Sequence, residues 1–396
     1  MSAVKILTFT TLYPNAAQPR HGVFVEQRLR RLVESGQVQA QVVAPVPWFP
    51  FTHAWFGGYA AFATVPRHEE RHGIGILHPR YILLPKVGMT FAPFFLAAAM
   101  IPVVRRIIRG GYDFDIIDAH YFYPDGVAAT LLGKIFKKPV VITARGTDLN
   151  LIPQYLLPRK MILWAARRAA GIITVCRALK DVLIRLGISD GDVTVLRNGV
   201  DLKLFHPISR EKWRQQLGLT RTTLLSVGHL IQRKGHDLVI QALADLPDVE
   251  LLIAGDGEEE GALKSLALSC GVANRVKFLG AIMQDQLKNY YGAVDALVLA
   301  SSREGWANVL LEAMACGTPV VASNVWGTPE VVAAPEAGVL MPDRSPAALA
   351  QAVRKLLDHY PDHAATRRYA ERFSWDDTTQ GQLALFNDVV QKRAVQ

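Results

Sequence analysis

Two successive runs of alternating strand-like and helix-like segments constrain the fold of this chain more than any other feature. In the first run, apolar segments such as Lys5–Thr10, Asp115–Ala119 and Pro139–Thr143 alternate with helically periodic segments such as Gly22–Glu34. A second run of the same kind begins after a Pro-containing turn at Phe205–Pro207. This alternation predicts parallel sheets covered by helices on both faces, so we expect an α/β protein with two doubly wound domains.

The length of the chain supports this division, because 396 residues suit two domains better than one. We predict an N-terminal domain over residues 1–205, a C-terminal domain over 206–374, and a helix over 375–396 that crosses back to the N-terminal domain. Sheets of this kind bind ligands at the carboxyl ends of their strands. The expected site is therefore a cleft in which the two domains face each other.

Positive charge is concentrated in the first part of the chain. The net charge is +9, and residues 1–110 hold twelve Lys and Arg against four Asp and Glu, whereas residues 111–396 hold thirty-two against thirty-one. The same region contains the aromatic segment Pro45–Phe62. Basic charge beside Trp and Phe is typical of an anionic membrane contact, and plain solubility charge is the alternative. Because no nucleic-acid-reading motif accompanies the charge, we expect no nucleic-acid partner.

One apolar segment, Val87–Val104, is about as long as a membrane-spanning helix. Pro93 and Pro102 interrupt it, and three arginines follow it. We expect a buried or half-buried helix of the N-terminal domain, with an interfacial segment or a true span as the alternatives.

The three cysteines, Cys176, Cys270 and Cys316, lie far apart and form no CxxC pair. This spacing predicts neither a disulfide framework nor a zinc site, and it suits a reducing compartment. The N-terminal apolar run is too short for a signal peptide, so we interpret it as a buried strand. We therefore expect a cytoplasmic protein that is peripheral at the inner face of the membrane if the basic aromatic region contacts lipid.

The segment Ser301–Ser323 carries the most chemical information. Glu304 is expected in the loop that leaves a strand, and Asn308 is a candidate N-cap, which puts Glu312 in the first turn of a helix. Free N–H groups at such a helix start favour a phosphate. A carboxylate in this turn can accept hydrogen bonds from ribose hydroxyls, and a carboxylate in the preceding loop can do so from a hexose. The alternative for Glu312 is that it only complements the helix dipole.

This segment resembles the Glu-x7-Glu motif of retaining GT-B glycosyltransferases of the group-1, or family-4, type. The resemblance covers nearly the whole chain, from the first strand to the FSW segment before the terminal helix. It implies that Glu304 contacts the donor sugar and that Glu312 contacts the nucleotide ribose. The residues between them are assigned to the same donor site, namely Trp306, Ala307, Asn308 and Val309.

A second segment, Val227–Ala242, resembles the start of the nucleotide-binding domain in this family. Lys234 matches the family's Lys before a Gly, whereas His229 stands where the family usually has Arg. A departing nucleoside diphosphate needs cations as charge builds on its oxygen, and Lys234 with Arg233 would supply them. The alternative is a solvated Lys-Gly turn, and His229 could be a plain loop residue.

Two further glycines are assigned to the donor side on the same resemblance. Gly255 lies in a GDG turn after a strand, although such turns are common without any ligand. Gly280 occupies the family's position close to the base. Neither motif is specific by itself.

In the first domain, four residues are candidates for the catalytic and acceptor side. Gly22 follows a loop that reaches the donor diphosphate in the family, and a simple helix-start glycine is the alternative. His120 ends a strand, where the family places a His against the reacting sugar. Arg145 replaces the His of the family's HGxD turn, which leaves Asp148 as an acceptor-side or loop-structure residue. Arg177 is the fourth candidate, as a residue that faces the cleft.

The resemblance implies a retaining hexosyltransferase that uses a nucleoside-diphosphate sugar and a saccharide or lipid-linked acceptor in cell-surface polysaccharide or glycoconjugate synthesis. No DxD-like pair ends a strand of the nucleotide domain, so we expect no metal and no cofactor. The catalytic assignments are His120, Lys234 and Glu304. A nucleotide-sugar epimerase and a non-catalytic nucleotide-sugar-binding protein are the alternatives on this fold. A NAD-dependent oxidoreductase is disfavoured because GxGxxG follows neither first strand.

Overall fold

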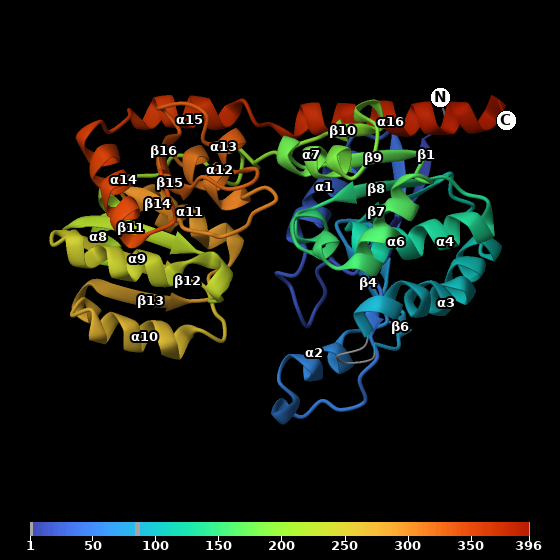
Figure 1. Cartoon of the computed structure of the whole chain (residues 1–396), viewed down its shortest axis with the longest axis horizontal. Coiled ribbons are helices and arrows are strands. Elements are labelled where there is room, and N and C mark those ends of the chain that lie inside the picture. The colour runs from blue at the N-terminus through green and yellow to red at the C-terminus, as the bar shows by residue number, and fades with distance from the viewer. Residues whose placement is uncertain (1–2, 84–87, 396) are drawn as a thin grey trace. The chain divides into compact units, whose positions relative to one another are not determined.

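The computed structural model describes residues 3–83 and 88–395, which form two compact units (Figure 1). Unit 1 contains the chain up to Arg197 together with the residues from Asp376 onward, and unit 2 contains Asn198–Trp375. The boundary lies eight residues before the predicted position at 205. The reason is that Phe205 packs against Tyr291 of unit 2, with ring centroids 6.0 Å apart.

Unit 1 is built on an eight-stranded sheet, within the described residues, in the order β10-β9-β8-β7-β1-β2-β5-β4. All neighbouring strands are parallel except β4 and β5. The strands are β1 (Val4–Phe9), β2 (Val38–Val43), β4 (His68–Arg71), β5 (Ile74–Leu77), β7 (Ile116–His120), β8 (Val140–Ala144), β9 (Gly171–Thr174) and β10 (Val193–Val195), with β3 (Val46–Pro47) and β6 (Arg80–Tyr81) paired separately.

The helices of unit 1 follow the strands as the alternating pattern predicts. They are α1 (Val23–Glu34), α2 (Gly58–Thr64), α3 (Gly88–Arg109), α4 (Val127–Phe136), α5 (Thr147–Asn150), α6 (Leu156–Ala166), α7 (Arg177–Arg185) and α16 (Trp375–Val395), with short turns η1 (Ala54–Phe56), η2 (Phe122–Gly126), η3 (Ile152–Gln154) and η4 (Asp190–Asp192).

The core of unit 1 joins segments from both ends of the sequence. On α1, Val25, Leu29 and Leu32 recur at helical spacing and are buried. They share one apolar cluster with Phe386 and Val389 of α16. The late helix α16 is therefore part of the core of unit 1.

Helix α3 is the apolar segment that resembles a membrane span by length and composition. Within Thr90–Arg109, a stretch of 18 residues has a mean hydropathy of 1.7, and 39% of that stretch is buried. It is the one such helix in the described part of the chain. Leu96, Met100 and Val104 lie on the buried face, while Phe94 lies on the exposed one. This is the half-buried helix expected from the sequence, although Val87 lies outside the described residues.

Unit 2 contains a parallel six-stranded sheet in the order β13-β12-β11-β14-β15-β16. Its strands are β11 (Thr222–Val227), β12 (Val249–Ala254), β13 (Val276–Gly280), β14 (Ala296–Leu299), β15 (Val320–Ser323) and β16 (Gly338–Met341). Its helices are α8 (Arg210–Leu217), α9 (His236–Ala242), α10 (Glu260–Ser269), α11 (Gln284–Ala293), α12 (Asn308–Ala315), α13 (Thr328–Val331), α14 (Pro346–Asp358) and α15 (His363–Glu371), with turns η5 (Gln232–Lys234), η6 (Leu243–Asp245) and η7 (Ala273–Arg275).

Both sheets reverse their strand order at a defined point, between β1 and β7 in unit 1 and between β11 and β14 in unit 2. In doubly wound sheets, the loops on either side of such a reversal separate and leave room for a ligand at the carboxyl ends of the strands. The candidate site residues follow these strands.

Candidate functional site

In unit 2, the loops after β11 and β14 bring Lys234 and Glu304 together. Lys234 ends the short turn η5, which follows β11, and Glu304 lies between β14 and α12. The Nζ atom of Lys234 donates a hydrogen bond to Oε1 of Glu304 at 2.7 Å. The two residues are 70 positions apart in the sequence, so the reversal of strand order is what makes them neighbours.

Gly235 allows the η5 turn to approach β14 this closely. Its φ angle is 73°, in the left-handed region that favours glycine. A Cβ atom at this position would lie 2.2 Å from the carbonyl oxygen of Ala300. The Lys-Gly pair that the sequence singled out therefore has a steric role beside the chemical one.

Glu304 is a buried carboxylate with two cations beside it. An Nη atom of Arg233 lies 3.6 Å from Oε1 of Glu304, and it donates to the carbonyl oxygen of Arg303 at 2.9 Å. Burial alone would raise the pKa of Glu304, but the charges of Lys234 and Arg233 outweigh it and hold the pKa below its usual value. Glu304 is therefore an ionised hydrogen-bond acceptor in a low-dielectric position.

Glu312 is also buried, but its partners are neutral. Its carboxylate accepts a hydrogen bond from Nε2 of Gln284 at 2.9 Å and another from the Tyr291 hydroxyl at 2.9 Å. Burial raises the pKa of Glu312, and these hydrogen bonds offset only part of the effect. The sequence analysis did not identify Gln284 or Tyr291, which lie on α11 and hold the carboxylate in one orientation.

The predicted start of α12 was wrong by about one residue. Asn308 is the first residue of the helix rather than its N-cap, which is Ala307, and no side chain caps this end. Glu312 consequently lies beyond the first turn. The Asn308 side chain instead accepts a hydrogen bond from Nδ2 of Asn198 at 3.3 Å.

The other donor-side residues are distributed around these loops. The indole of Trp306 is buried and packs against Phe373, with ring centroids 6.0 Å apart. Val309 is partly exposed at the start of α12. His229 is largely exposed, and its Nδ1 atom lies 3.7 Å from a carboxylate oxygen of Asp256.

A buried histidine that the sequence analysis missed holds the loop after β11 in place. Nδ1 of His236 accepts a hydrogen bond from the Ser226 hydroxyl at 2.8 Å, and Nε2 lies 3.3 Å from the carbonyl oxygen of His229. Burial lowers the pKa of His236 to about 4. A neutral His236 therefore ties the strand β11 to the turn that carries Lys234.

The glycines after β12 and at the end of β13 differ in surroundings. A Cβ atom on Gly255 would lie 1.9 Å from the carbonyl oxygen of Gly228, so this position requires glycine for the close approach of two loops. Gly280 has a φ of 67° and open space where a Cβ would be. The Gly280 carbonyl accepts a hydrogen bond from the Gly255 N–H at 2.8 Å.

In unit 1, a buried aspartate joins the loops after β1 and β7. Asp125 accepts hydrogen bonds from the Thr11 N–H at 2.7 Å and the Thr11 hydroxyl at 2.9 Å. Burial raises the pKa of Asp125 to about 7. The sequence analysis did not identify Asp125, which fixes the base of the loop that leads to Gly22.

His120 ends β7 as predicted, but its side chain lies inside the unit. Nε2 of His120 donates to Asp118 at 3.1 Å, and Nδ1 accepts from Nη2 of Arg145 at 2.6 Å. The side chain is 1% exposed, and burial lowers its pKa to about 4. Both ring nitrogens are engaged, so in this structure neither is available to a sugar.

Asp148 holds the turn around Arg145 and Gly146. It accepts hydrogen bonds from the Gly146 N–H at 2.7 Å and the Phe122 N–H at 2.8 Å, and it is fully buried. Of the two roles expected for Asp148, the structure favours the one in loop architecture. Arg177 begins α7, and its side chain is 66% exposed beside Asp181.

Gly22 precedes α1 with a φ of 71°, and a Cβ there would lie 2.4 Å from the backbone of Leu12. The backbone conformation and the close Leu12 backbone therefore require glycine at this position, whether or not a ligand binds there. The same β1–α1 loop borders a cavity of about 220 Å³ at the carboxyl ends of β1 and β2. Its polar and aromatic lining includes Asn15, His21 and Tyr81. A cavity of this size and chemistry suits one sugar ring.

No group of three or more His, Cys, Asp or Glu side chains is arranged to hold a metal ion in residues 3–83 and 88–395. In the same described residues, Cys176, Cys270 and Cys316 take part in no disulfide.

Comparison with known proteins identifies the family to which the chain is similar. Residues 209–373 match the family described as Glycosyl transferases group 1, and residues 60–204 match Glycosyltransferase Family 4. The D-inositol 3-phosphate glycosyltransferase of Geodermatophilus obscurus is 33% identical over 360 residues, which cover 83% of this chain and 79% of that protein. TuaC of Bacillus subtilis, named as a teichuronic acid biosynthesis glycosyltransferase, is 28% identical over 361 residues, or 89% of each chain.

Among solved structures, HepE of Anabaena in complex with UDP-glucose has a similar fold. The TM-score is 0.71 at 21% identity, and the match covers 96% of this chain and 98% of HepE. At this identity the likeness concerns the fold.

Proposed function

Because this chain belongs to the group-1 glycosyltransferases and has the GT-B fold, we propose that it transfers a hexose from a nucleoside-diphosphate sugar to a hydroxyl acceptor with retained anomeric configuration. The observation that carries the proposal is the contact of 2.7 Å between Lys234 and Glu304 at the strand reversal of unit 2. It combines a cation for a diphosphate with a buried, ionised acceptor for sugar hydroxyls.

On the donor side, Glu304 accepts hydrogen bonds from the hexose, and Glu312 accepts them from the ribose. Lys234 and Arg233 lie beside Glu304 and neutralise the charge that develops on the departing diphosphate. Because the protein supplies these cations itself, the proposed transfer needs neither a metal nor a cofactor.

In the proposed step, the bond between the anomeric carbon and the phosphate oxygen breaks while the acceptor oxygen bonds to the same face of that carbon. The departing phosphate oxygen takes the proton of the acceptor hydroxyl. This front-face course is implied by membership in a family whose members resemble this chain in the Glu-x7-Glu segment. It requires no second carboxylate as a nucleophile.

The proposed acceptor is a saccharide or a lipid-linked saccharide in polysaccharide or glycoconjugate synthesis. The cavity beside the β1–α1 loop offers aromatic and polar groups to a sugar ring, with Tyr81 and His21 in its lining. The similarity to TuaC, whose name refers to teichuronic acid, supports a polymer-building role.

We also propose that unit 1 contacts the inner face of an anionic membrane as a peripheral protein. The segment before and within α2 exposes several aromatic side chains in the basic part of the chain, as described above. Trp55 is 88% exposed, and Phe51 stacks on Phe56 with ring centroids 5.1 Å apart. Aromatic rings at such a surface suit the headgroup region of a bilayer.

A thermal-shift panel with UDP, GDP, ADP and their sugars, each with and without EDTA, tests the donor proposal. We expect one nucleotide to raise the unfolding midpoint, because it binds only the folded protein, and we expect EDTA to leave the shift unchanged. A shift that disappears with EDTA would contradict metal-independent binding. If no nucleotide raises the unfolding midpoint, the result would contradict the proposal that the protein uses these donors.

A further inference from the structure

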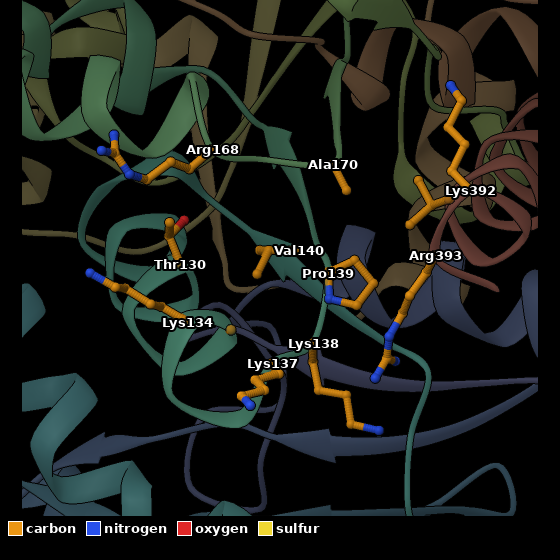
Figure 2. Close-up of a pocket in the computed structure, with 12 residues that line it drawn as sticks. Thr130, Lys134, Lys137, Lys138, Pro139, Val140, Arg168, Ala170, Lys392 and Arg393 are labelled. Carbon is orange, nitrogen blue, oxygen red and sulfur yellow. The ribbon is translucent and has the colours of Figure 1, made fainter. Parts of the chain in front are cut away.

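A second cavity in unit 1 lies at the amino ends of β8 and β9, whereas the candidate site residues lie at the carboxyl ends of the strands. Its floor includes Pro139 and Val140 at the start of β8 and Ala170 just before β9, and its volume is about 660 Å³ (Figure 2). His120 and Arg145, by contrast, lie at the far ends of β7 and β8, His120 as the last residue of β7 and Arg145 just after β8. The cavity is therefore separate from the loops that carry the proposed chemistry of unit 1.

Six cationic side chains surround this cavity. Figure 2 shows Lys134 and Arg168 on one side of the floor, Lys392 and Arg393 on the other, and Lys137 with Lys138 along a third side. They come from α4, the segment after α4, the segment after α6 and the end of α16. No Asp or Glu is among the residues that line the cavity.

Only two of the six cations are paired with carboxylates. Lys138 contacts Asp113 at 2.6 Å, and Lys392 contacts Asp388 at 2.7 Å. Within the described residues, the other four have no carboxylate at ion-pair distance. Arg168 donates to the Trp164 carbonyl oxygen at 3.3 Å and Arg393 to the Asp115 carbonyl oxygen at 3.4 Å, and neither contact neutralises the guanidinium charge. The charges of all four are therefore available to an external anion.

Cations are stabilised near the carboxyl ends of helices, but this effect accounts for only part of the positive charge around the cavity. The carboxyl ends of α4 and α16 each carry about half a negative charge, which is less than the charge of the four unpaired side chains. One of these, Lys137, has a φ of 54°. For a lysine this left-handed conformation costs about 1 kcal/mol, and glycine would avoid that cost. Helix capping therefore favours glycine here rather than lysine.

We propose that this basic cavity binds an anionic ligand that carries at least two phosphate groups. Four unpaired cations distributed around three sides match several phosphate oxygens better than a single carboxylate. The volume is large enough for a small polyphosphorylated molecule or for lipid phosphates presented by a membrane. The proposal does not depend on the activity proposed above, because the cavity shares no residue with the donor or acceptor sites.

Hydrogen–deuterium exchange of the full-length protein, with sodium tripolyphosphate as the probe, tests the proposal locally. Tripolyphosphate is expected to slow exchange in the peptides that contain residues 130–140 and 388–393. A local measurement is needed because tripolyphosphate is also expected to bind near Lys234 in unit 2. Absence of any slowing in these peptides would overturn the proposal.

The variant for this test is Lys134→Ala combined with Lys137→Gly. Both changes suit the local backbone, since alanine favours an exposed helix position and glycine fits the left-handed one. We expect the tripolyphosphate concentration for half-protection to rise about tenfold or more, as each lost charge-assisted contact weakens binding. The matched control is Lys212→Ala with Lys355→Ala, two exposed helical lysines of unit 2 that change the net charge equally. Equal protection in both double variants would overturn the assignment.

Vesicles distinguish the two sources of phosphate. Protection of the same peptides by phosphatidylglycerol vesicles, and not by phosphatidylcholine vesicles, would identify lipid headgroups, provided that the Lys134→Ala, Lys137→Gly variant loses it. Protection by tripolyphosphate alone would identify a soluble polyphosphate. Protection by neither probe in the wild-type protein would show that the cavity is not an anion site.

Discussion

Glu304 and Glu312 are buried carboxylates eight residues apart whose surroundings shift their pKa values in opposite directions. Two cations hold the pKa of Glu304 below its usual value, whereas burial among neutral partners raises the pKa of Glu312. Glu304 therefore accepts hydrogen bonds from a ligand as an anion over a wide pH range. A cationic group on a ligand would compete with Lys234 for this carboxylate, whereas a sugar hydroxyl could donate a hydrogen bond to it while Lys234 stays in place.

Replacing Lys234 with methionine tests the role of its charge at the residue scale. We expect kcat to fall about a hundredfold or more, because one preorganised donor to the leaving group is lost. Turnover with the nucleotide sugar identified by the thermal-shift panel measures this. Glu304→Gln is expected to show a similar loss, while far-UV circular dichroism of both variants should match the wild type. Near-normal turnover in either variant would contradict the site assignment.

The sequence predicted Lys234 and Glu304 because each lies in a local motif after a strand. It did not predict Tyr291, His236 or Asp125, since no short pattern marks a side chain that acts through a distant partner. The Tyr291 hydroxyl, for example, reaches Glu312 across 21 residues of sequence. His120 was found by its position at a strand end, but its burial depends on Arg145, which only the fold brings to it.

At the scale of elements, the alternating pattern identified most strands and helices because both units repeat one simple arrangement. The antiparallel strand β4 was not anticipated, since its sequence His68–Arg71 is polar and lacks the apolar alternation of a strand. It forms at the sheet edge by pairing with β5. The pairs β1–β7 and β11–β14 set the positions of the candidate loops, and their adjacency follows from topology rather than from local sequence.

The contact of the η5 turn with β14 leads to a test at this scale. Gly235→Ala would place a Cβ 2.2 Å from the Ala300 carbonyl at a left-handed φ, so we expect a loss of about 2 kcal/mol or more in the free energy of unfolding. Weaker nucleotide binding should accompany it, because Lys234 moves with the turn. Urea denaturation and the thermal-shift assay measure these two effects.

Gly261→Ala is the matched control for that substitution. Gly261 lies in α10 with open space at its Cβ position, so alanine there is expected to leave stability unchanged or raise it by about 0.5 kcal/mol. If both variants unfold at the same urea concentration, the close approach at Gly235 does not matter for the fold.

For the whole molecule, positive charge and exposed aromatic side chains are concentrated in the first part of unit 1. Residues 1–110 carry a surplus of eight positive charges, and the remainder carries a surplus of one. The exposed rings of Trp48, Phe51 and Trp55 lie in the same region. Charge would draw unit 1 to an anionic surface, and the rings would then enter the headgroup layer.

Vesicle sedimentation tests this whole-molecule property. At low salt we expect tighter binding to phosphatidylglycerol vesicles than to phosphatidylcholine vesicles. Phe51→Ala combined with Trp55→Ala should weaken that binding about tenfold, since each buried aromatic side chain contributes about 1.5–3 kcal/mol and only part of each ring is inserted. Leu268→Ala, at a position 71% exposed in unit 2, is the control and should change nothing. Equal binding of the wild type to both lipids would contradict the membrane proposal.

The course of the chain through unit 1 has a consequence for synthesis on the ribosome. The chain leaves unit 1 at Arg197, and Thr378 of α16 donates a hydrogen bond back to the Arg197 carbonyl oxygen where it returns. Phe386 and Val389 complete the apolar cluster that contains Ile6 and Leu29. Because α16 is synthesised after all of unit 2, the apolar core of unit 1 stays incomplete until the end of the chain has left the ribosome. Unit 2 is one continuous segment and can fold before unit 1 is complete. A chaperone that binds the exposed apolar core of unit 1 would act in this period.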